Sequence, residues 1–302
     1  LIEETRLGSG ASDLRAALRE LGLPFRALPV AGRLSRDLVQ ALRATLRDLG
    51  AEVLHTTGYK ADLHGGWAAG WGRRWPVVST VHGWLFRADL KEQFYGWLNL
   101  QALRRCARVI ALSRHYEAML AARGVPRERL VRIPSGLDPA TCPPGPWPAE
   151  GTPFTIGLAG RLSEEKNHDL FLRAARRALD GGARLRFLLA GDGPLRAALA
   201  ARSAELNLAA HVEMPGFLPR EDFLSRVHAV ALCSRIENLP YSILEAMAWS
   251  RPVLATQVGG LPDLVEDGVT GWLVPGEDEG ALAGRMALLA GDPGAARRLG
   301  AA

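Results

Sequence analysis

Residues 154–168 read Phe-Thr-Ile-Gly-Leu-Ala-Gly-Arg-Leu-Ser-Glu-Glu-Lys-Asn-His, and this stretch decides the fold. Its first five residues are an apolar run typical of a buried strand, and a helical pattern begins near His168. Two glycines, Gly157 and Gly160, let the backbone turn tightly and approach a ligand closely. A buried strand that leads through a glycine turn into a helix is the repeating unit of a parallel α/β sheet.

The same alternation of apolar runs and helical patterns continues along the chain in both directions. Helical spacing is clearest at Leu14, Leu18 and Leu21 and again at Leu38, Leu42 and Leu46. Continuous apolar strands between helices predict parallel sheets covered on both faces. The other predicted strands are residues 53–54, 77–78, 109–112, 186–190, 227–232 and 252–255.

A proline-rich stretch divides the chain. Seven prolines fall between Pro134 and Pro153, and proline at that density sustains neither a helix nor a central strand. We therefore predict two doubly wound α/β domains: residues 1–138, a linker at 139–153, and residues 154–302. Ligands of such sheets bind beyond the carboxyl ends of the strands.

Composition excludes several classes of protein. The chain has 302 residues, of which 48% are hydrophobic and 23% charged, as in ordinary globular proteins. The three cysteines are scattered and far apart, which favours buried thiols in a reduced, cytoplasmic protein. No run of apolar residues is long enough for a membrane span.

Charge is distributed unevenly along the chain. Residues 1–150 hold 21 Lys or Arg and 14 Asp or Glu, whereas residues 151–302 are slightly acidic. A basic first half favours anionic partners such as lipid headgroups, although an ordinary solvated Arg-rich surface explains it slightly better. No basic run or aromatic-basic motif of the nucleic-acid type is present, so no nucleic-acid partner is expected.

Two cations lie in the loop that follows the first strand of the second half. Arg161 and Lys166 are five positions apart and could clamp a diphosphate, Arg with a forked contact and Lys as a point charge. Lysine is rare here, since Lys166 is one of only three. From the spacing alone, it is equally possible that Arg161 and Lys166 are two solvated cations in a loop and bind no diphosphate. The glycine spacing matches neither a dinucleotide fingerprint nor a Walker loop.

Two carboxylates stand around a predicted helix start further along. Glu237 ends a loop after a buried strand, Pro240 suits a first helical turn, and Glu245 lies about one and a half turns inside. The amides of a helix start suit a phosphate, and a carboxylate inside the helix could accept bonds from a ribose diol. From these residues alone, a structural interpretation is favoured over a ligand site: one of the two carboxylates caps the helix and the other is simply exposed.

Four motifs in order make the second half similar to the nucleotide-sugar domain of family 4 retaining glycosyltransferases, which have the GT-B fold. They are G-R-L-x-x-E-K-N from Gly160, A-G-D-G-P from Ala190, the E-x7-E run that ends E-A-M-A, and P-V-x-A-T-x-V-G-G-x-P-D from Pro252. The first half resembles the family more loosely, for example at residues 53–62, 81–84 and 133–138.

The resemblance implies a role for each matching residue. Arg161 and Lys166 match the pair that neutralises the donor diphosphate. Glu245 matches the carboxylate that binds the ribose, and Glu237 matches the carboxylate near the donor sugar. Backbone groups at Gly160, Asn238, Leu239 and Ile243 match those that line the donor. His82 matches a first-domain histidine that reaches towards the donor sugar; by itself it is more typical of a packed histidine.

The implied activity is transfer of a sugar, with retention, from a nucleoside-diphosphate sugar of the UDP or GDP type. The acceptor would be a saccharide or a lipid-linked saccharide in envelope or exopolysaccharide synthesis, and neither a metal nor a bound cofactor is expected. Two alternatives stay open: a GT-B-like sugar-nucleotide epimerase, and a non-catalytic nucleotide-binding module. Cytoplasmic placement with peripheral contact to an anionic membrane is a further expectation.

Departures from the family pattern also carry predictions. Trp249-Ser250 replaces a small residue and glycine after E-A-M-A, which we expect to change local packing. No apolar strand precedes the first helix, and the last family helices are absent after Ala302, so we expect a fragment. Residues 86–105 predict an amphipathic helix with Phe94 and Trp97 on its apolar face; packing into the core is favoured over a membrane-surface role.

Overall fold

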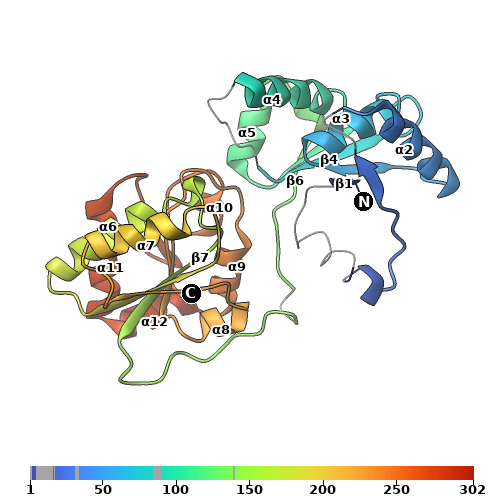
Figure 1. Ribbon diagram of the computed structural model, residues 1–302. Coiled ribbons are helices and arrows are strands. Elements are labelled where there is room, and N and C mark those ends of the chain that lie inside the picture. The colour runs from blue at the N-terminus through green and yellow to red at the C-terminus, as the bar shows by residue number, and fades with distance from the viewer. Residues whose placement is uncertain (1, 5–15, 17, 31–33, 84–89, 139) are drawn as a thin grey trace. The chain divides into compact units, whose positions relative to one another are not determined.

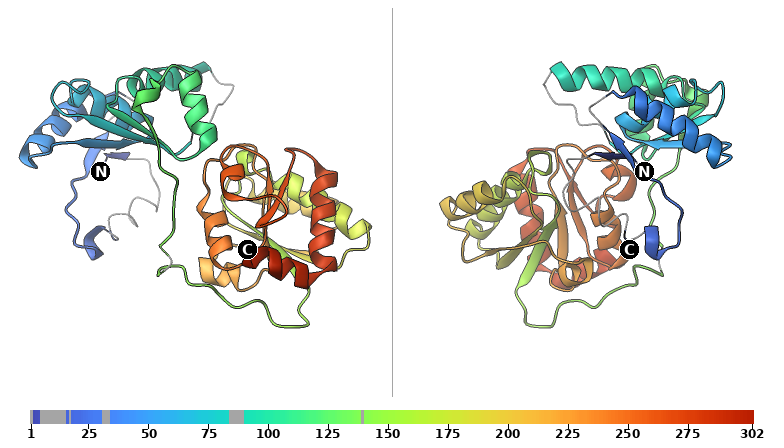
Figure 2. Two further views of the ribbon diagram at one scale, coloured as in Figure 1. Left: turned by 180° about the vertical axis from the view of Figure 1, so that it is seen from behind. Right: turned by 45° about the vertical axis from the view of Figure 1, so that its right-hand side comes forward.

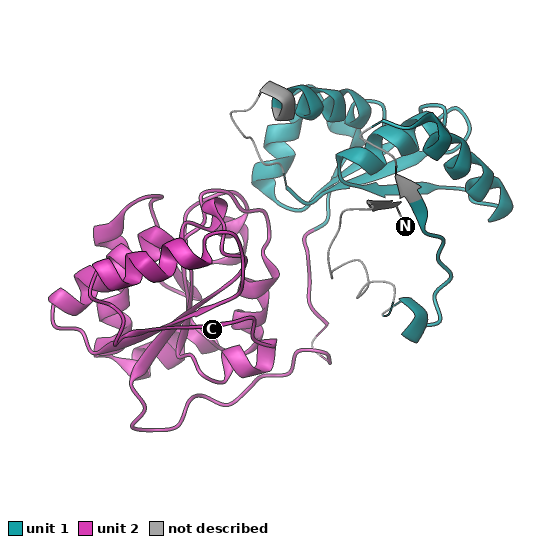
Figure 3. Cartoon of the chain, in the orientation of Figure 1, with its two compact units in different colours: residues 1–133 teal, residues 134–302 magenta. Residues whose placement is uncertain are grey.

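The computed structural model describes residues 2–4, 16, 18–30, 34–83, 90–138 and 140–302. The chain divides into two compact units, Leu1–Ile133 and Pro134–Ala302 (Figure 3). The division falls before the proline-rich segment, earlier than the predicted boundary at residue 138. Each unit is a parallel α/β structure, as the alternation of strand and helix patterns predicts.

Unit 1 contains two parallel sheets. The larger has the order β3-β4-β5-β6, built from Leu54–Thr57, Val77–Val81, Arg108–Ala111 and Leu130–Arg132. Its helices are α2 (Arg36–Asp48), α3 (Tyr59–Ala68), α4 (Leu90–Leu103) and α5 (Arg114–Ala122), and a 3-10 turn, η1, covers Arg127–Arg129. Helix α2 buries Leu38 and Leu46, which confirms that predicted helix. The helix predicted around Leu14 lies largely outside the described residues.

The smaller sheet corrects one prediction. Residues Ile2–Glu4 form β1, which pairs in parallel with β2 (Leu28–Val30). The expectation that no strand precedes the first helix is therefore wrong. A three-residue strand with two glutamates has no apolar run for a sequence pattern to detect, and its pairing with β2 is what defines it.

Unit 2 has one six-stranded parallel sheet of order β12-β11-β10-β7-β8-β9, with helices on both faces (Figures 1 and 2). Its strands are β7 (Phe154–Ala159), β8 (Leu185–Ala190), β9 (Val212–Gly216), β10 (Ala229–Leu232), β11 (Val253–Thr256) and β12 (Gly271–Val274). Its helices are α6 (His168–Asp180), α7 (Arg196–Glu205), α8 (Arg220–Leu224), α9 (Tyr241–Ala248), α10 (Leu261–Leu264), α11 (Glu279–Gly291) and α12 (Pro293–Ala301).

The two faces of this sheet form two separate apolar cores. Phe187 and Leu189 of β8 pack with α6 and α11, whereas Leu188 and Ala190 pack with α8 and α9. This division follows from the pleat, which sends successive side chains to opposite faces. Burial on both faces is why the central strands are continuous apolar runs in the sequence.

Within its described residues the proline-rich segment has neither helix nor strand, and it packs against the rest of unit 2 through Trp249 and Arg251. A Cβ added at Gly145 would come within 2.2 Å of the Trp249 ring, so the indole lies directly on this glycine. Arg251 is fully buried, donates to the carbonyls of Pro146 and Trp249, and lies over the rings of Trp147 and Trp249. Trp249 therefore docks this segment against the rest of the unit, and the expected change in packing relative to the family stays a prediction.

Ser250 occupies a backbone conformation that favours glycine, with φ at +56°. We expect Ser250→Gly to raise the free energy of unfolding by about 1 kcal/mol, because left-handed backbone strains every residue with a Cβ. Thermal unfolding of the two proteins measures the difference. An unchanged or lower melting temperature for the glycine variant would contradict the assignment of strain to this residue.

Two buried histidines make unit 2 sensitive to acid. Burial, and then the charges of Arg251 and Arg297, lower the pKa of His228 to about 4, and burial lowers that of His168 likewise to about 4. The backbone N–H of Thr155 donates to Nδ1 of His228 at 3.0 Å, and protonation would abolish that bond.

Because both folded-state pKa values lie below the usual 6.5, the unfolded chain binds more protons between about pH 6.5 and 4. Stability should therefore be complete above pH 6.5 and decline as the pH falls towards 4, by up to about 3 kcal/mol for each histidine. Denaturant unfolding of wild type and His228→Asn at pH 7 and 4.5 measures this. The variant should lose less stability on acidification, and an equal loss would contradict the argument.

The cysteines behave as the sequence predicts. Cys106, Cys142 and Cys233 are all buried and unpaired. Burial raises the pKa of the Cys106 thiol to about 12, so this group stays protonated at neutral pH. Such thiols pack as small hydrophobic side chains.

The amphipathic-helix prediction is partly wrong. Helix α4 covers Leu90–Leu103, and residues 84–89 lie outside the described residues. The side chains of Phe94 and Trp97 are each 54% exposed and stack on one another, with ring centroids 6.1 Å apart. These two aromatic rings therefore do not pack into the core. No helix among the described residues is both long and apolar enough to cross a bilayer.

Candidate active site

The strand order of unit 2 creates a switch point between β7 and β10. The strands β8 and β9 lie on one side of β7 within the sheet, whereas β10, β11 and β12 lie on its other side. Ligands of doubly wound sheets bind beyond the carboxyl ends of the strands at such a point. The loop after β7 carries Gly160, Arg161 and Lys166, and the loop after β10 carries Glu237.

The structure brings Lys166 and Glu237 into direct contact. The ammonium of Lys166 donates to Oε1 of Glu237, and the Ser234 hydroxyl donates to the same oxygen at 2.8 Å. Both charged side chains are mostly buried, with 22% of Lys166 and 10% of Glu237 exposed. Sequence reasoning predicted both residues but not this pairing, and it missed Ser234, whose only signal is its place after a buried strand.

Gly160 borders this ion pair, and Arg161 follows it in the same loop. A Cβ on Gly160 would lie 3.8 Å from Cε of Lys166, so the glycine borders the lysine side chain. Arg161 is exposed, and its guanidinium has no hydrogen bond or ion pair within the described part of the chain. Burial raises the pKa of Glu165, but the Ser163 hydrogen bond and the charges of Arg161 and Lys166 lower it overall.

Two glycines from neighbouring loops approach the site so closely that no side chain fits. Gly191 follows β8, and a Cβ there would come within 1.9 Å of the Gly160 carbonyl oxygen. Gly259 follows β11, and a Cβ there would come within 1.8 Å of the Glu237 carbonyl oxygen. Both have positive φ, at +140° and +56°. These glycines of the A-G-D-G-P and V-G-G motifs therefore fix the positions of the two site loops.

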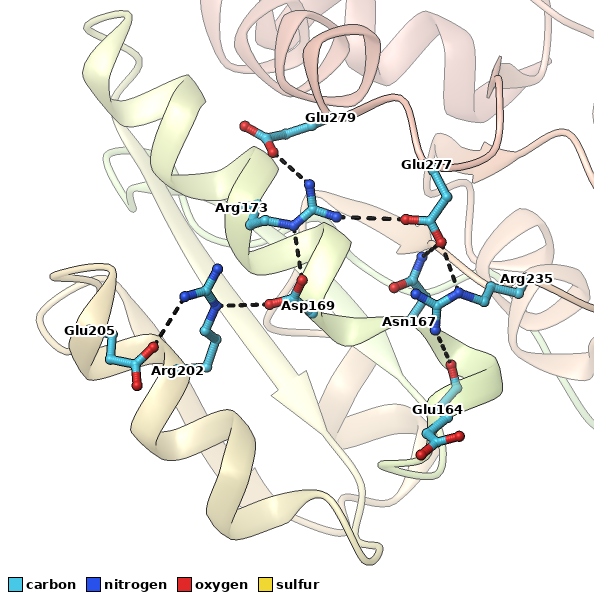
Figure 4. Close-up of polar contacts among 9 residues, drawn as sticks. All are labelled: Glu164, Asn167, Asp169, Arg173, Arg202, Glu205, Arg235, Glu277 and Glu279. Carbon is cyan, nitrogen blue, oxygen red and sulfur yellow. Dashed lines mark hydrogen bonds and ion pairs between the residues drawn. The ribbon is translucent and has the colours of Figure 1, made fainter.

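A polar network holds the turn that carries Lys166 (Figure 4). The Glu277 carboxylate accepts from Asn167 Nδ2 at 3.0 Å and from Arg235 Nε at 2.8 Å. Arg235 also donates to the Glu164 carbonyl at 2.9 Å. The 3-10 turn η2 (Glu164–Lys166) is thus tied to the loop after β10 and to the loop before α11.

A second group of ion pairs in the same network anchors the first turns of α6. Arg173 bonds Asp169 at 2.9 Å and Glu279 at 2.7 Å, and Arg202 of α7 bonds the other oxygen of Asp169 at 2.9 Å (Figure 4). These contacts join α6, α7 and the start of α11. The helix that follows Lys166 is therefore held by two other helices, α7 and α11.

Helix α9 provides the remaining predicted donor-binding residues. Its N-cap is Pro240, one position earlier than the predicted first turn, and Ile243 is fully buried within it. Asn238 and Leu239 are buried in the loop before the helix. Glu245 lies in the middle of α9, half-buried, with its carboxylate 4.0 Å from the Arg220 guanidinium. Burial raises the pKa of Glu245 and the charge of Arg220 opposes that shift.

His82 belongs to unit 1. It follows β4 directly, at the carboxyl end of that strand, and it is exposed. The carboxyl ends of the β3–β6 strands are the edge where a doubly wound sheet binds ligands, so its position within unit 1 suits a role at a site.

Among the described residues, no three His, Cys, Asp or Glu side chains gather at metal-binding spacing. The groups present at the switch point are instead two cations, a carboxylate with a hydroxyl, a helix start and close-packed glycine turns. Cations and helix-terminal amides bind phosphoryl groups, and carboxylates accept hydrogen bonds from sugar hydroxyls. The arrangement is therefore chemically suited to an anionic ligand that also carries hydroxyl groups.

Comparison with known protein families gives matches along most of the chain. Residues 5–141 match the model of Glycosyltransferase Family 4, and residues 153–292 match that of Glycosyl transferases group 1. The D-inositol 3-phosphate glycosyltransferase of Mycolicibacterium vanbaalenii is 31% identical over 88% of this chain and 68% of its own length. The amylovoran biosynthesis glycosyltransferase AmsK of Erwinia amylovora is 30% identical over 58% of this chain.

The chain spans about half the length of several curated relatives that it matches, 45% in the case of AmsK. Among solved structures, Anabaena HepE in complex with UDP and glucose superposes with a TM-score of 0.83 over 99% of this chain and 91% of that one. Its sequence is 19% identical, so this likeness concerns the fold. The chain belongs to glycosyltransferase family 4 and has the GT-B fold of two parallel-sheet α/β domains.

Proposed function

We propose that this chain transfers a sugar, with retention of configuration, from a nucleoside-diphosphate sugar to a saccharide or lipid-linked acceptor in exopolysaccharide synthesis. The observation that carries the proposal is the buried Lys166–Glu237 pair at the switch point of unit 2. It joins a cation suited to a diphosphate and a carboxylate suited to sugar hydroxyls. The complexes of HepE with UDP-glucose and the name of AmsK support the donor class and the pathway.

In this proposal each group has one task. Lys166 and Arg161 neutralise the diphosphate, and the amides at the start of α9 around Ile243 face its oxygens. Glu245 accepts hydrogen bonds from the ribose. Glu237, together with the backbone of Asn238 and Leu239, holds the donor sugar, and His82 of unit 1 contributes from the other domain.

We propose the following chemical step, which this charge arrangement suits. The bond between the anomeric carbon and the diphosphate oxygen breaks, and the acceptor oxygen bonds to that carbon on the same face. The acceptor proton passes to the departing diphosphate oxygen, so no separate base is needed. Negative charge grows on the diphosphate as the bond breaks, so fixed cations there stabilise the transition state more than the ground state. We propose that no metal takes part.

The direct test is incubation of the protein with UDP-glucose and, separately, a GDP-sugar, with a saccharide acceptor and with lipid-linked acceptors. The proposal predicts a new glycosidic product and equimolar nucleoside diphosphate, at a rate that EDTA does not change. A rate that collapses with EDTA and returns with Mn²⁺ would contradict the metal-free step. Nucleotide release without a glycosylated product would favour an epimerase, and binding without turnover would favour a nucleotide-binding module.

A further inference from the structure

A second cluster of charged residues lies in unit 1. It lines a hollow of about 730 Å³ beside the turn that carries Gly70. We call it the arginine pocket. Its side chains are four arginines and two tryptophans: Arg43, Arg73, Arg105, Arg129, Trp67 and Trp71.

The arginine pocket lies at the amino edge of the β3–β6 sheet. Arg73 precedes β4, Arg105 precedes β5, and Arg129 directly precedes β6. Because these strands are parallel, the segments that lead into them share one edge. His82 follows β4 and so lies at the opposite edge. The arginine pocket is therefore separate from the position of His82.

The four guanidinium groups have no carboxylate partner among the residues that the structure describes. Like charges that converge without a counter-charge repel one another, so such a cluster costs stability unless an anion binds. Elsewhere the described arginines often pair with acids, as Arg132 does with Glu117 at 3.1 Å. The arginine pocket thus holds uncompensated positive charge in a basic half of the chain.

Structural roles use only part of the hydrogen-bonding capacity of these arginines. Arg43 donates to the carbonyls of Trp67 and Ala68 at the end of α3, at 2.8 and 3.1 Å. Arg129 and Arg105 also donate to backbone carbonyls around the end of α4. Each guanidinium has five N–H donors, so most remain available. Arg73 is exposed, and its guanidinium makes no hydrogen bond within the described residues.

The backbone around Trp71 is strained. Gly70, Trp71 and Gly72 all have positive φ, at +61°, +53° and +82°, and a bulky side chain is rare in this conformation. The indole lies on Gly66, where an added Cβ would come within 2.3 Å of the ring, and the Arg105 guanidinium lies 5.5 Å above its centroid. Strain of this kind is concentrated at binding sites, where it holds a side chain in a required position.

We propose that the arginine pocket binds a phosphate-bearing anion, with Arg73 and Arg105 as its main ligands and the two tryptophans as an apolar wall. The planar guanidinium fork matches phosphate oxygens, and four cations suit a multiply charged group better than a single carboxylate. The ligand chemistry is shared by an anionic lipid headgroup and by a soluble diphosphate. The proposal does not rest on sugar transfer by this chain.

The first experiment measures thermal unfolding during titration with sodium pyrophosphate at constant ionic strength. It uses a Lys166→Ala background, so that anion binding in unit 2 contributes as little as possible. Pyrophosphate should raise the melting temperature of the protein. The double variant Arg73→Ala/Arg105→Ala should bind pyrophosphate at least about tenfold more weakly, because hydrogen bonds to charged groups are lost. Arg108→Ala/Arg298→Ala, which removes two arginines outside the pocket, should leave the affinity unchanged.

The second experiment identifies the source of the phosphate by sedimentation with vesicles of phosphatidylcholine, with and without phosphatidylglycerol. Sedimentation that needs phosphatidylglycerol and Arg73 and Arg105 would assign the pocket to a lipid headgroup. A pyrophosphate response without vesicle binding would assign it to a soluble ligand.

The proposal is overturned if neither ligand responds to loss of Arg73 and Arg105, or if the control pair has the same effect. Should the alanine pair prove unstable, Arg73→Gln/Arg105→Gln removes the charge while keeping most of the side-chain volume. The same two measurements then apply to the glutamine pair.

Discussion

Lys166→Ala should reduce sugar transfer by about 100- to 1000-fold, because loss of one preorganised electrostatic contact to the transition state has an effect of that size. The lysine projects from the η2 turn outside both cores of unit 2, so the fold should survive. Initial rates with saturating donor measure the loss of transfer, and circular dichroism shows whether the fold is intact.

Two further variants control this experiment. Lys166→Arg keeps the charge at the site and should retain more activity than the alanine variant. Arg298→Ala removes a cation whose side chain is 75% exposed and should leave the rate unchanged. A Lys166→Ala protein with the wild-type rate would show that the ion pair with Glu237 is structural.

Gly259→Ala should cause a second large loss of transfer, again about 100-fold, by displacing Glu237. The added Cβ would collide with the Glu237 carbonyl oxygen, since the two would be 1.8 Å apart. Either loop must then move, and a displacement near 1 Å at a reacting centre can cost about 100-fold in rate. Rates and denaturant unfolding should be measured together on the purified variant.

Gly268→Ala is the matched control for this substitution. Gly268 has a similar positive φ of +77°, but nothing lies within 4 Å of an added Cβ. It should therefore cost about 1 kcal/mol of stability from backbone strain alone and leave the rate unchanged. If both variants lost the same activity, strain rather than the contact with Glu237 would be responsible.

The sequence predicted every inner strand of the two larger sheets and missed three of their four edge strands. In unit 2 the predicted strands correspond to β7, β8, β10 and β11, whereas β9 and β12 are the two edges. The edge strand β9 contains Glu213 and Pro215 and so has no continuous apolar run, whereas the edge strand β12 reads Gly-Trp-Leu-Val and was missed despite its apolar run. In unit 1 the edge strand β6, Leu-Val-Arg, was missed, whereas the other edge strand, β3, was predicted through residues 53–54.

At the candidate site, the sequence indicated the candidate residues but not how they contact one another. Lys166 and Glu237 lie 71 positions apart, and only the neighbouring order of β7 and β10 brings their loops together. The contacts of Gly191 and Gly259 with those loops likewise depend on strand order. The arginine pocket was beyond prediction because its members come from four separate segments of unit 1.

The central claim is that the switch point of unit 2 binds a nucleoside diphosphate through Lys166. Its most direct test is a thermal-shift titration of wild type and Lys166→Ala with UDP, GDP and ADP. A ligand that binds only the folded state stabilises it by about 2.7 kcal/mol at a hundredfold excess over Kd. The account predicts a clear shift with one nucleotide that Lys166→Ala abolishes. No shift with any nucleotide, or an equal shift in the variant, would contradict it.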